Sequence, residues 1–220
     1  MVGYQASLSM ADCNTMNYYV LSQKEAPGCP SGILYADLFD KFYADTKGVE
    51  FGFFPWYAER GKPGPRTPFP EGMVLISKDK FYDFDVRSVS KFFYVVSDEF
   101  LAACRQVEVN IVDSVKIQVL SEAGERISKK DYHAVLFEEL DVRANSDPRS
   151  TFVEENSRPI RFKKLVLPDD WKLDLFKYKR LISGSDSLVC SETFKKLAEG
   201  FKGVEFNPLD SVQWSGIRRV

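Results

Sequence analysis

Two stretches of this sequence resemble each other, and internal similarity of this kind constrains a fold strongly. Residues 95–100, VVSDEF, are similar to residues 189–194, VCSETF. Further along, residues 107–115, VEVNIVDSV, match residues 204–212, VEFNPLDSV, at a spacing that is three residues longer. A third, partial copy runs from Phe39 to Phe51 and ends in KGVEF, as residues 202–206 do.

Each copy predicts a strand, a helix and a second strand. Ser97 and Ser191 precede acidic residues, which is typical of a helix start, because the hydroxyl accepts from unpaired N–H groups and acids suit the positive end of the helix dipole. After Ser191, apolar residues recur at the spacing of an amphipathic helix (Phe194, Leu197, Ala198 and Phe201). Gly48 and Gly203 stand where a helix-terminating glycine is expected, and Val-Glu-Phe then alternates like a half-buried strand. We therefore predict an α+β fold of mixed or antiparallel sheets with a few amphipathic helices, built from repeated strand-helix-strand units.

Further strands and a long loop are predicted between these units. The expected strands cover residues 17–21, 73–77, 160–167 and 175–182, and residues 115–120 and 133–140 form a hairpin. Phe53 to Pro70 contains five prolines and is interpreted as a loop, and long ordered loops are often functional. We expect residues 1–15 to be a disordered extension or tag. Residues 16–145 and 146–220 are expected to form two α+β halves or one continuous domain.

Composition excludes several classes of protein. The net charge of −2 lacks the basic excess of nucleic-acid binders. No run approaches the roughly 20 apolar residues that cross a bilayer, and residues 1–16 do not look like a secretory signal. The four cysteines are widely spaced without a CxxC pair, which favours the reducing cytoplasm over a disulfide framework.

Residues for catalysis are scarce. His133 is the only histidine, and its place in a predicted strand favours a structural role. Residues 183–187, SGSDS, lack the form of a nucleophile elbow and are interpreted as a turn. We predict no catalytic residues, no cofactor and no metal site. An enzyme of an unfamiliar kind that uses Glu138 and Asp141 with Tyr132 stays open as an alternative.

Charges and aromatic residues indicate a binding function instead. Residues 131–155 hold seven acids and two bases, whereas residues 158–180 hold eight bases and three acids. These stretches either neutralise each other or form an acidic face that steers a basic partner. Aromatic anchors dominate many interfaces, and the expected partner contacts are Phe53, Phe54, Trp56, Tyr57, Glu138, Glu139, Asp141, Trp171 and Trp214.

The two ends of the chain carry a family resemblance. Residues 17–22, NYYVLS, and 27–35, PGCPSGILY, open it, and LVCSE followed by a helix and GVEFNP closes it at residues 188–208. Over roughly residues 16–212 the sequence resembles the immunity proteins of bacterial polymorphic toxin systems, in particular families forty-three and eleven. The resemblance implies a cognate protein toxin that is neutralised by stoichiometric binding in the producing cell, without activity or cofactor. A structural or scaffold protein that uses the same surfaces is a further alternative.

Overall fold

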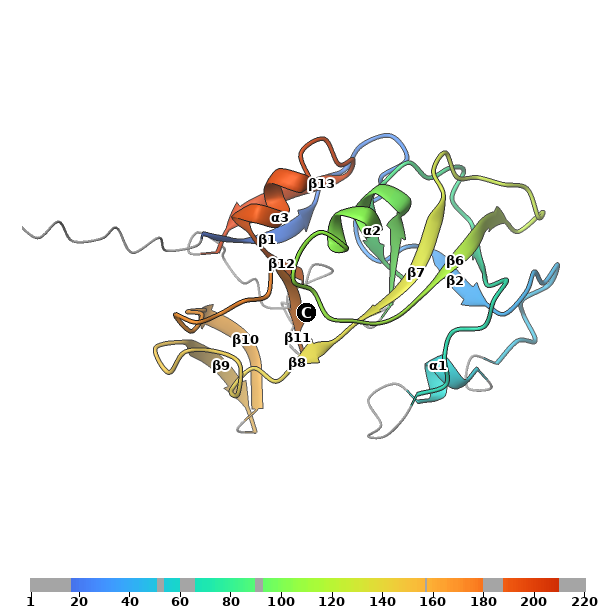
Figure 1. Cartoon of the computed structure of the whole chain (residues 1–220). Helices are drawn as coiled ribbons and strands as arrows, with labels where there is room; N and C mark the ends of the chain where they lie inside the picture. Colours follow the sequence, from blue (N-terminus) through green and yellow to red (C-terminus); the bar gives the residue numbers. More distant parts are fainter. Residues whose placement is uncertain are drawn as a thin grey trace, which may run out of the picture.

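The fold is mostly β-sheet. The computed structural model describes residues 17–50, 54–59, 66–89, 93–156, 158–179 and 188–209. In these residues the strands form three mixed or antiparallel sheets, and only three short helices accompany them (Figure 1). The general class predicted from the sequence is therefore right, although the helical share is small.

The largest sheet has six strands in the order β2-β3-β6-β7-β5-β4. Their bounds are β2 (Ala36–Phe39), β3 (Val74–Ser77), β6 (Ile111–Ser121), β7 (Tyr132–Phe137), β5 (Tyr94–Ser97) and β4 (Val86–Ser88). Neighbours run antiparallel except β3 and β6, which are parallel. The antiparallel pairing of β6 with β7 confirms the predicted hairpin, but its second strand ends at Phe137, and residues 139–140 pair in a different sheet.

The second sheet joins distant parts of the chain. Its order is β13 (Val204–Pro208), β1 (Tyr18–Gln23), β12 (Leu188–Ser191), β11 (Leu175–Tyr178) and β8 (Glu139–Leu140). β1 lies between β12 and β13, so that Tyr19 is opposite Cys190 and Leu21 is opposite Phe206. A separate ribbon pairs β9 (Thr151–Glu155) with β10 (Arg158–Lys164). The division into two halves at residue 145 stays a prediction. β1 belongs to the first half, but it pairs with β12 and β13 of the second half.

Two helices begin at the serines that the sequence indicated. α2 (Asp98–Cys104) is capped by Ser97, whose Oγ accepts from Phe100 N at 3.1 Å. α3 (Glu192–Leu197) is capped by Ser191, whose Oγ accepts from Phe194 N at 3.2 Å. The rings of Phe100 and Phe194 meet edge to face at 5.4 Å, so the two helices pack against each other (Figure 1).

Repetition of whole strand-helix-strand units is not seen. Residues 40–50 contain no helix, so the third copy is wrong and Gly48 terminates nothing. Residues 107–109 form only a single bridge, from Val109 to Leu175, whereas their sequence match at 204–206 lies in β13. α3 ends before Gly203. The matched residues are common types, and their surroundings in the fold decide which of them form strands.

Each capping serine also bonds to an aspartate just before the neighbouring strand. Ser97 donates to Asp85, which has no exposed surface, and Lys130 Nζ and Lys202 N each donate to the same carboxylate at 2.6 Å. Ser191 donates to Asp174, which also accepts from the backbone N–H of Glu108. We call these groups the Asp85 corner and the Asp174 corner.

A buried arginine next to the Asp85 corner ties three segments together. The Arg87 guanidinium donates to the carbonyl oxygens of Pro30 at 2.6 Å and of Val86 and Gly203 at 2.8 Å. Gly203 has a φ of 74°, and a Cβ there would lie 2.7 Å from Arg87 Nη2. Glycine is therefore needed at this position for both backbone conformation and space. The contacts link the N-terminal segment, β4 and the turn before β13.

Candidate aromatic cavity

A cavity of about 400 Å³ opens beside α1 (Pro55–Ala58). Proline in the first turn suits a helix start because its φ is already helical and its missing N–H has no partner to lose. The predicted loop from Phe53 to Pro70 is thus interrupted by one helical turn, which is a correction. The cavity is lined by Trp56, Glu59, Arg66, Thr67, Pro68, Phe69, Phe93, Val112, Asp113 and Leu136.

Aromatic rings from three segments form the frame of the cavity. Trp56 stacks on Phe54 with ring centroids 4.8 Å apart, and both side chains are buried. Phe93 meets Phe69 at 5.7 Å and Tyr57 at 5.2 Å, both edge to face. Edge-to-face and stacked arrangements are the favourable geometries for aromatic pairs, so the rings stabilise one another. The walls are therefore aromatic and largely apolar.

Polar groups of the cavity are unevenly satisfied. Asp113 Oδ2 accepts from Phe69 N at 2.6 Å, and the Glu59 carboxylate accepts from Thr67 N and Oγ at 2.7 and 2.9 Å. Trp56 is 7% exposed, and its Nε1 is buried without a hydrogen-bond partner in the described chain. An unsatisfied buried donor costs about 1–3 kcal/mol. The cavity thus combines apolar, aromatic walls with two carboxylates that each accept from a backbone N–H.

The aromatic residues expected to contact a partner do not all lie at the cavity. Trp56 lines it, and Phe54 and Tyr57 support its walls. Trp171 is not part of this lining and packs against Phe176 at 4.8 Å, also with a buried Nε1 that has no partner in the described residues. Phe53 and Trp214 lie outside the described residues.

None of the three expected acidic contacts lines the cavity, and each has its own hydrogen-bond or ion-pair partner. Glu139 forms an ion pair at 3.0 Å with Lys177, whose pKa is lowered by burial. Asp141 accepts from the backbone N–H groups of Arg143 and Ala144 at 3.0 Å and so holds a turn. Glu138 is exposed and accepts from Asn110 at 2.7 Å.

His133 has a local partner as well. Its Nε2 lies 2.7 Å from Asp98 Oδ1 at the start of α2. Tyr132, the tyrosine of the enzyme alternative, is fully buried and donates to the Phe84 carbonyl at 2.7 Å. Among the described residues no group of three His, Cys, Asp or Glu side chains could hold a metal ion. Residues 183–187 lie outside the described residues.

Carboxylates of the acidic stretch are mostly neutralised by nearby bases. Asp131 pairs with Lys116 at 2.9 Å and Arg126 at 2.7 Å, and these hydrogen bonds lower its pKa. Asp147 pairs with Arg149, and Glu154 pairs with Arg143. Of the acids in this stretch, only Glu139 pairs with a described base of residues 158–180, so the two stretches do not mainly neutralise each other, and the other paired acids take their bases from elsewhere. In the described chain, the helices are too short to cross a membrane.

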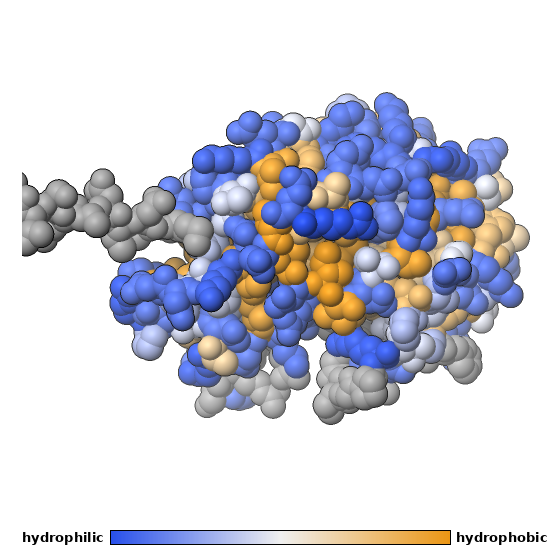
Figure 2. Space-filling view, viewed as in Figure 1, coloured by the Kyte–Doolittle hydropathy of each residue, from blue (hydrophilic) through white to orange (hydrophobic). Residues whose placement is uncertain are grey.

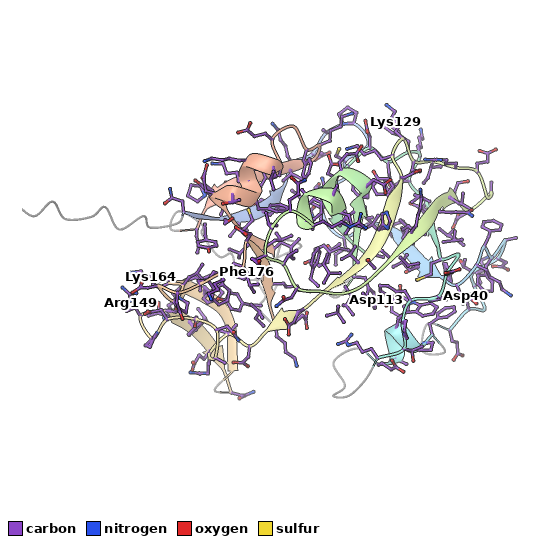
Figure 3. The ribbon with its side chains drawn as sticks, in the orientation of Figure 1. Asp40, Asp113, Lys129, Arg149, Lys164 and Phe176 are labelled. Atoms are coloured by element: carbon purple, nitrogen blue, oxygen red, sulfur yellow. The ribbon has the colours of Figure 1, made fainter. Side chains whose placement is uncertain are left out.

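Several cavity residues escaped the sequence argument. Phe69 lies in the predicted loop from Phe53 to Pro70 but was not singled out, and Phe93, Val112 and Asp113 come from two other segments with no shared local motif. The one available signal is Asp113, a carboxylate that follows the apolar residues Ile111 and Val112 at the start of β6. Figure 3 places Asp113 on the side of the molecule that carries α1, away from Arg149 and Lys164.

Comparison with known proteins identifies a family. No curated protein matches the sequence. The sequence model of the family described as Immunity protein 43 matches residues 56–215, which are 160 of the 220 residues. The match begins at Trp56 and includes every other residue that lines the cavity. This chain belongs to the Immunity protein 43 family.

Proposed function

We propose that this chain neutralises a cognate protein toxin by direct stoichiometric binding in the cytoplasm of the producing cell, and that the α1 cavity is part of the contact. The single observation that carries the cavity's role is its lining, in which the rings of Trp56, Phe69 and Phe93 lie beside the exposed Val112. Concave sites with mostly apolar and aromatic walls are where proteins usually receive a group of a partner.

The surroundings of the cavity suit a protein interface. Val112 lines it and is 49% exposed. Figure 2 shows apolar side chains gathered near the middle of one face, in the region where Figure 1 draws the connection from α2 to β6. Interfaces combine a buried apolar centre with a polar rim, and the exposed Arg66 provides such a rim group here.

Family membership favours an inhibitor over an enzyme. The enzyme alternative gains no support from Glu138, Asp141 and Tyr132, because Tyr132 is buried against Phe84 and Asp141 holds a turn. The scaffold alternative uses the same surfaces and differs only in the identity of the partner.

The test is binding to a toxin encoded beside the gene. We expect a 1:1 complex by size-exclusion chromatography with light scattering, and rescue of cells that express the toxin. Val112→Asp places a charge at the cavity rim and should weaken the complex about tenfold or more. Ile33→Asp is the matched control, because Ile33 is also exposed but does not line the cavity. Failure of the wild-type chain to bind or to rescue contradicts the proposal.

A further inference from the structure

We infer that a β-bulge at Val112 is a binding device, which presents this residue at the α1 cavity to an apolar side chain of the partner protein. The inference deepens the proposed function and rests on it, because the partner is the toxin. It names the residue that makes the contact and the chemical class of the group that it meets.

The bulge is one extra residue in the pairing of β6 with β7. Ile111 is opposite Phe137, and Asp113 is opposite Leu136, which is the adjacent residue of β7. Between these two pairs β7 advances by one residue and β6 by two, which leaves Val112 unpaired in this ladder. Two residues of one strand against one of its neighbour are the defining feature of a β-bulge.

The bulge lies inside a paired region and is not the frayed end of a strand. On one side of it, Ser114 is opposite Val135. On the other side, Glu138 N donates to the Asn110 carbonyl at 2.9 Å. A bulge disrupts the ladder locally, and bulges are common next to functional sites, where they re-aim a side chain. The extra residue therefore needs an explanation beyond the formation of the strand.

The bulge brings two consecutive residues to the same cavity. Side chains of a regular strand alternate between the two faces of the sheet, yet both Val112 and Asp113 line the α1 cavity. The flanking residues keep their regular faces, since Ile111 packs against the core cluster that contains Phe137, whereas Leu136 lines the cavity like Asp113. Removal of Val112 would leave an unbroken ladder in which no other side chain changes face. The sheet itself therefore does not need Val112.

The surface that the bulge adds to the cavity is apolar. Val112 carries only methyl groups, and 49% of it is exposed. The carboxylates of Glu59 and Asp113 already accept from this chain, at Thr67 N and Phe69 N. A charged partner group would lose its water against mostly apolar and aromatic walls, which is costly, whereas burial of an apolar group is favourable. An apolar side chain is therefore the group that fits.

The first test is the deletion of Val112. We expect its free energy of unfolding in urea to equal or exceed that of the wild-type chain, because the ladder becomes regular. Deletion of Gln118 is the matched control, since this residue is also exposed in β6 but is paired. Its loss shifts the strand by one residue and turns buried side chains such as Ile117 to the wrong face, which should destabilise the fold strongly. Equal damage by the two deletions overturns the inference.

The second test measures binding to the toxin encoded beside the gene. Deletion of Val112 should weaken the complex about tenfold or more. Val112→Ile keeps an apolar side chain and should bind within about twofold of the wild-type chain. Val112→Thr exchanges a methyl group for a hydroxyl and should bind about fivefold or more weakly, because a buried hydroxyl without a partner is costly. Ile33→Thr is the matched control, since Ile33 is exposed but does not line the cavity, and it should leave the affinity unchanged.

The outcomes separate this inference from the proposed function. A wild-type chain that binds no toxin contradicts the proposed function and, with it, the binding role of the bulge. If the wild-type chain and the chain without Val112 bind toxin equally well, the inference is wrong and toxin binding stands. If the deletion weakens binding but Val112→Thr binds as tightly as the wild-type chain, the apolar class of the partner side chain is wrong.

Discussion

The Asp85 corner and the Asp174 corner use the same hydrogen bonds in different surroundings. In both, a serine caps a helix and donates to an aspartate, and the serine N–H donates to the carbonyl of that aspartate at 2.8–2.9 Å. Asp85 has no exposed surface and also bonds to Lys130 and to the Lys202 backbone. Asp174 is partly exposed and adds only the backbone N–H of Glu108.

The two corners differ in the groups that the carboxylate joins. At the Asp174 corner the carboxylate accepts from two neutral donors, the Ser191 hydroxyl and the backbone N–H of Glu108, which lie 17 and 66 residues away. At the Asp85 corner the Asp85 carboxylate bonds to Lys130 and to the backbone of Lys202, which lie 45 and 117 residues further along the sequence. A charge buried this deeply is stable only with its partners in place. The Asp85 corner should therefore matter far more for stability.

The largest expected effect is the loss of Asp85. Asp85→Ala leaves Lys130 and two further donors without their acceptor, and we expect a loss of about 3–5 kcal/mol in the free energy of unfolding. Asp174→Ala should cost only about 1–2 kcal/mol, because its surroundings admit water. Urea denaturation at pH 7 measures both values. Equal losses would contradict the distinction between the corners.

Removal of the caps sharpens the same comparison. Ser97→Ala removes the cap of α2 and a donor to buried Asp85, and should cost about 2 kcal/mol. Ser191→Ala removes the equivalent contacts at a more exposed site, and about 1 kcal/mol is expected. Urea denaturation again provides the measurement, and a larger loss for Ser191→Ala would reverse our interpretation.

Contact between the two helices predicts energetic coupling. Phe100 and Phe194 pack edge to face, so a double-mutant cycle with leucine at both positions should give a coupling of about 0.5–1.5 kcal/mol. Phe162 belongs to a different core cluster, and the cycle of Phe100 with Phe162 should give a coupling near zero. Additive effects at Phe100 and Phe194 would show that the corners are energetically independent.

The smallest expected effect is a pH dependence at Asp83, beside the Asp85 corner. Its hydrogen bond with Lys202, at 2.7 Å, holds the pKa of Asp83 below its ordinary value. The associated stability is present above the unfolded-state pKa of about 3.9, and is lost as the pH falls towards the lower folded-state pKa. Through Asp83, the wild-type chain should lose up to about 1 kcal/mol of stability between pH 7 and pH 3, and Asp83→Asn should remove this part of the pH dependence. Thermal melts across that pH range measure it. If the stability difference between Asp83→Asn and the wild-type chain stays constant across that pH range, the prediction is contradicted.

Local signals predicted local structure well. The caps at Ser97 and Ser191 were readable because a capping bond spans three residues. The aspartates that complete these corners were not readable, since Asp85 lies 12 residues from Ser97 and Asp174 lies 17 from Ser191. The helical turn at Pro55 was hidden in a proline-rich stretch.

Long-range contacts explain what the sequence could not predict of the cavity. Trp56 was singled out as an aromatic residue, but the cavity that it lines also contains Phe93 and Asp113, which come from other strands and their connections. The surroundings of the expected acidic contacts could not be predicted for a similar reason, because Glu139 forms an ion pair with Lys177, which lies in a strand far along the chain. Predicted contacts at Phe53 and Trp214 stay predictions.

The position of β1 has a consequence for biosynthesis. Both neighbours of this strand, β12 and β13, are translated after it, and its last partner is Pro208. At the usual 5–20 residues per second, roughly 10–40 s pass between synthesis of β1 and of β13. During this interval the exposed edges of Tyr18–Gln23 have no native pairing partner, and such edges invite association with other chains. Newly made protein should thus depend on rapid completion of translation, or on chaperones, to reach its native sheet.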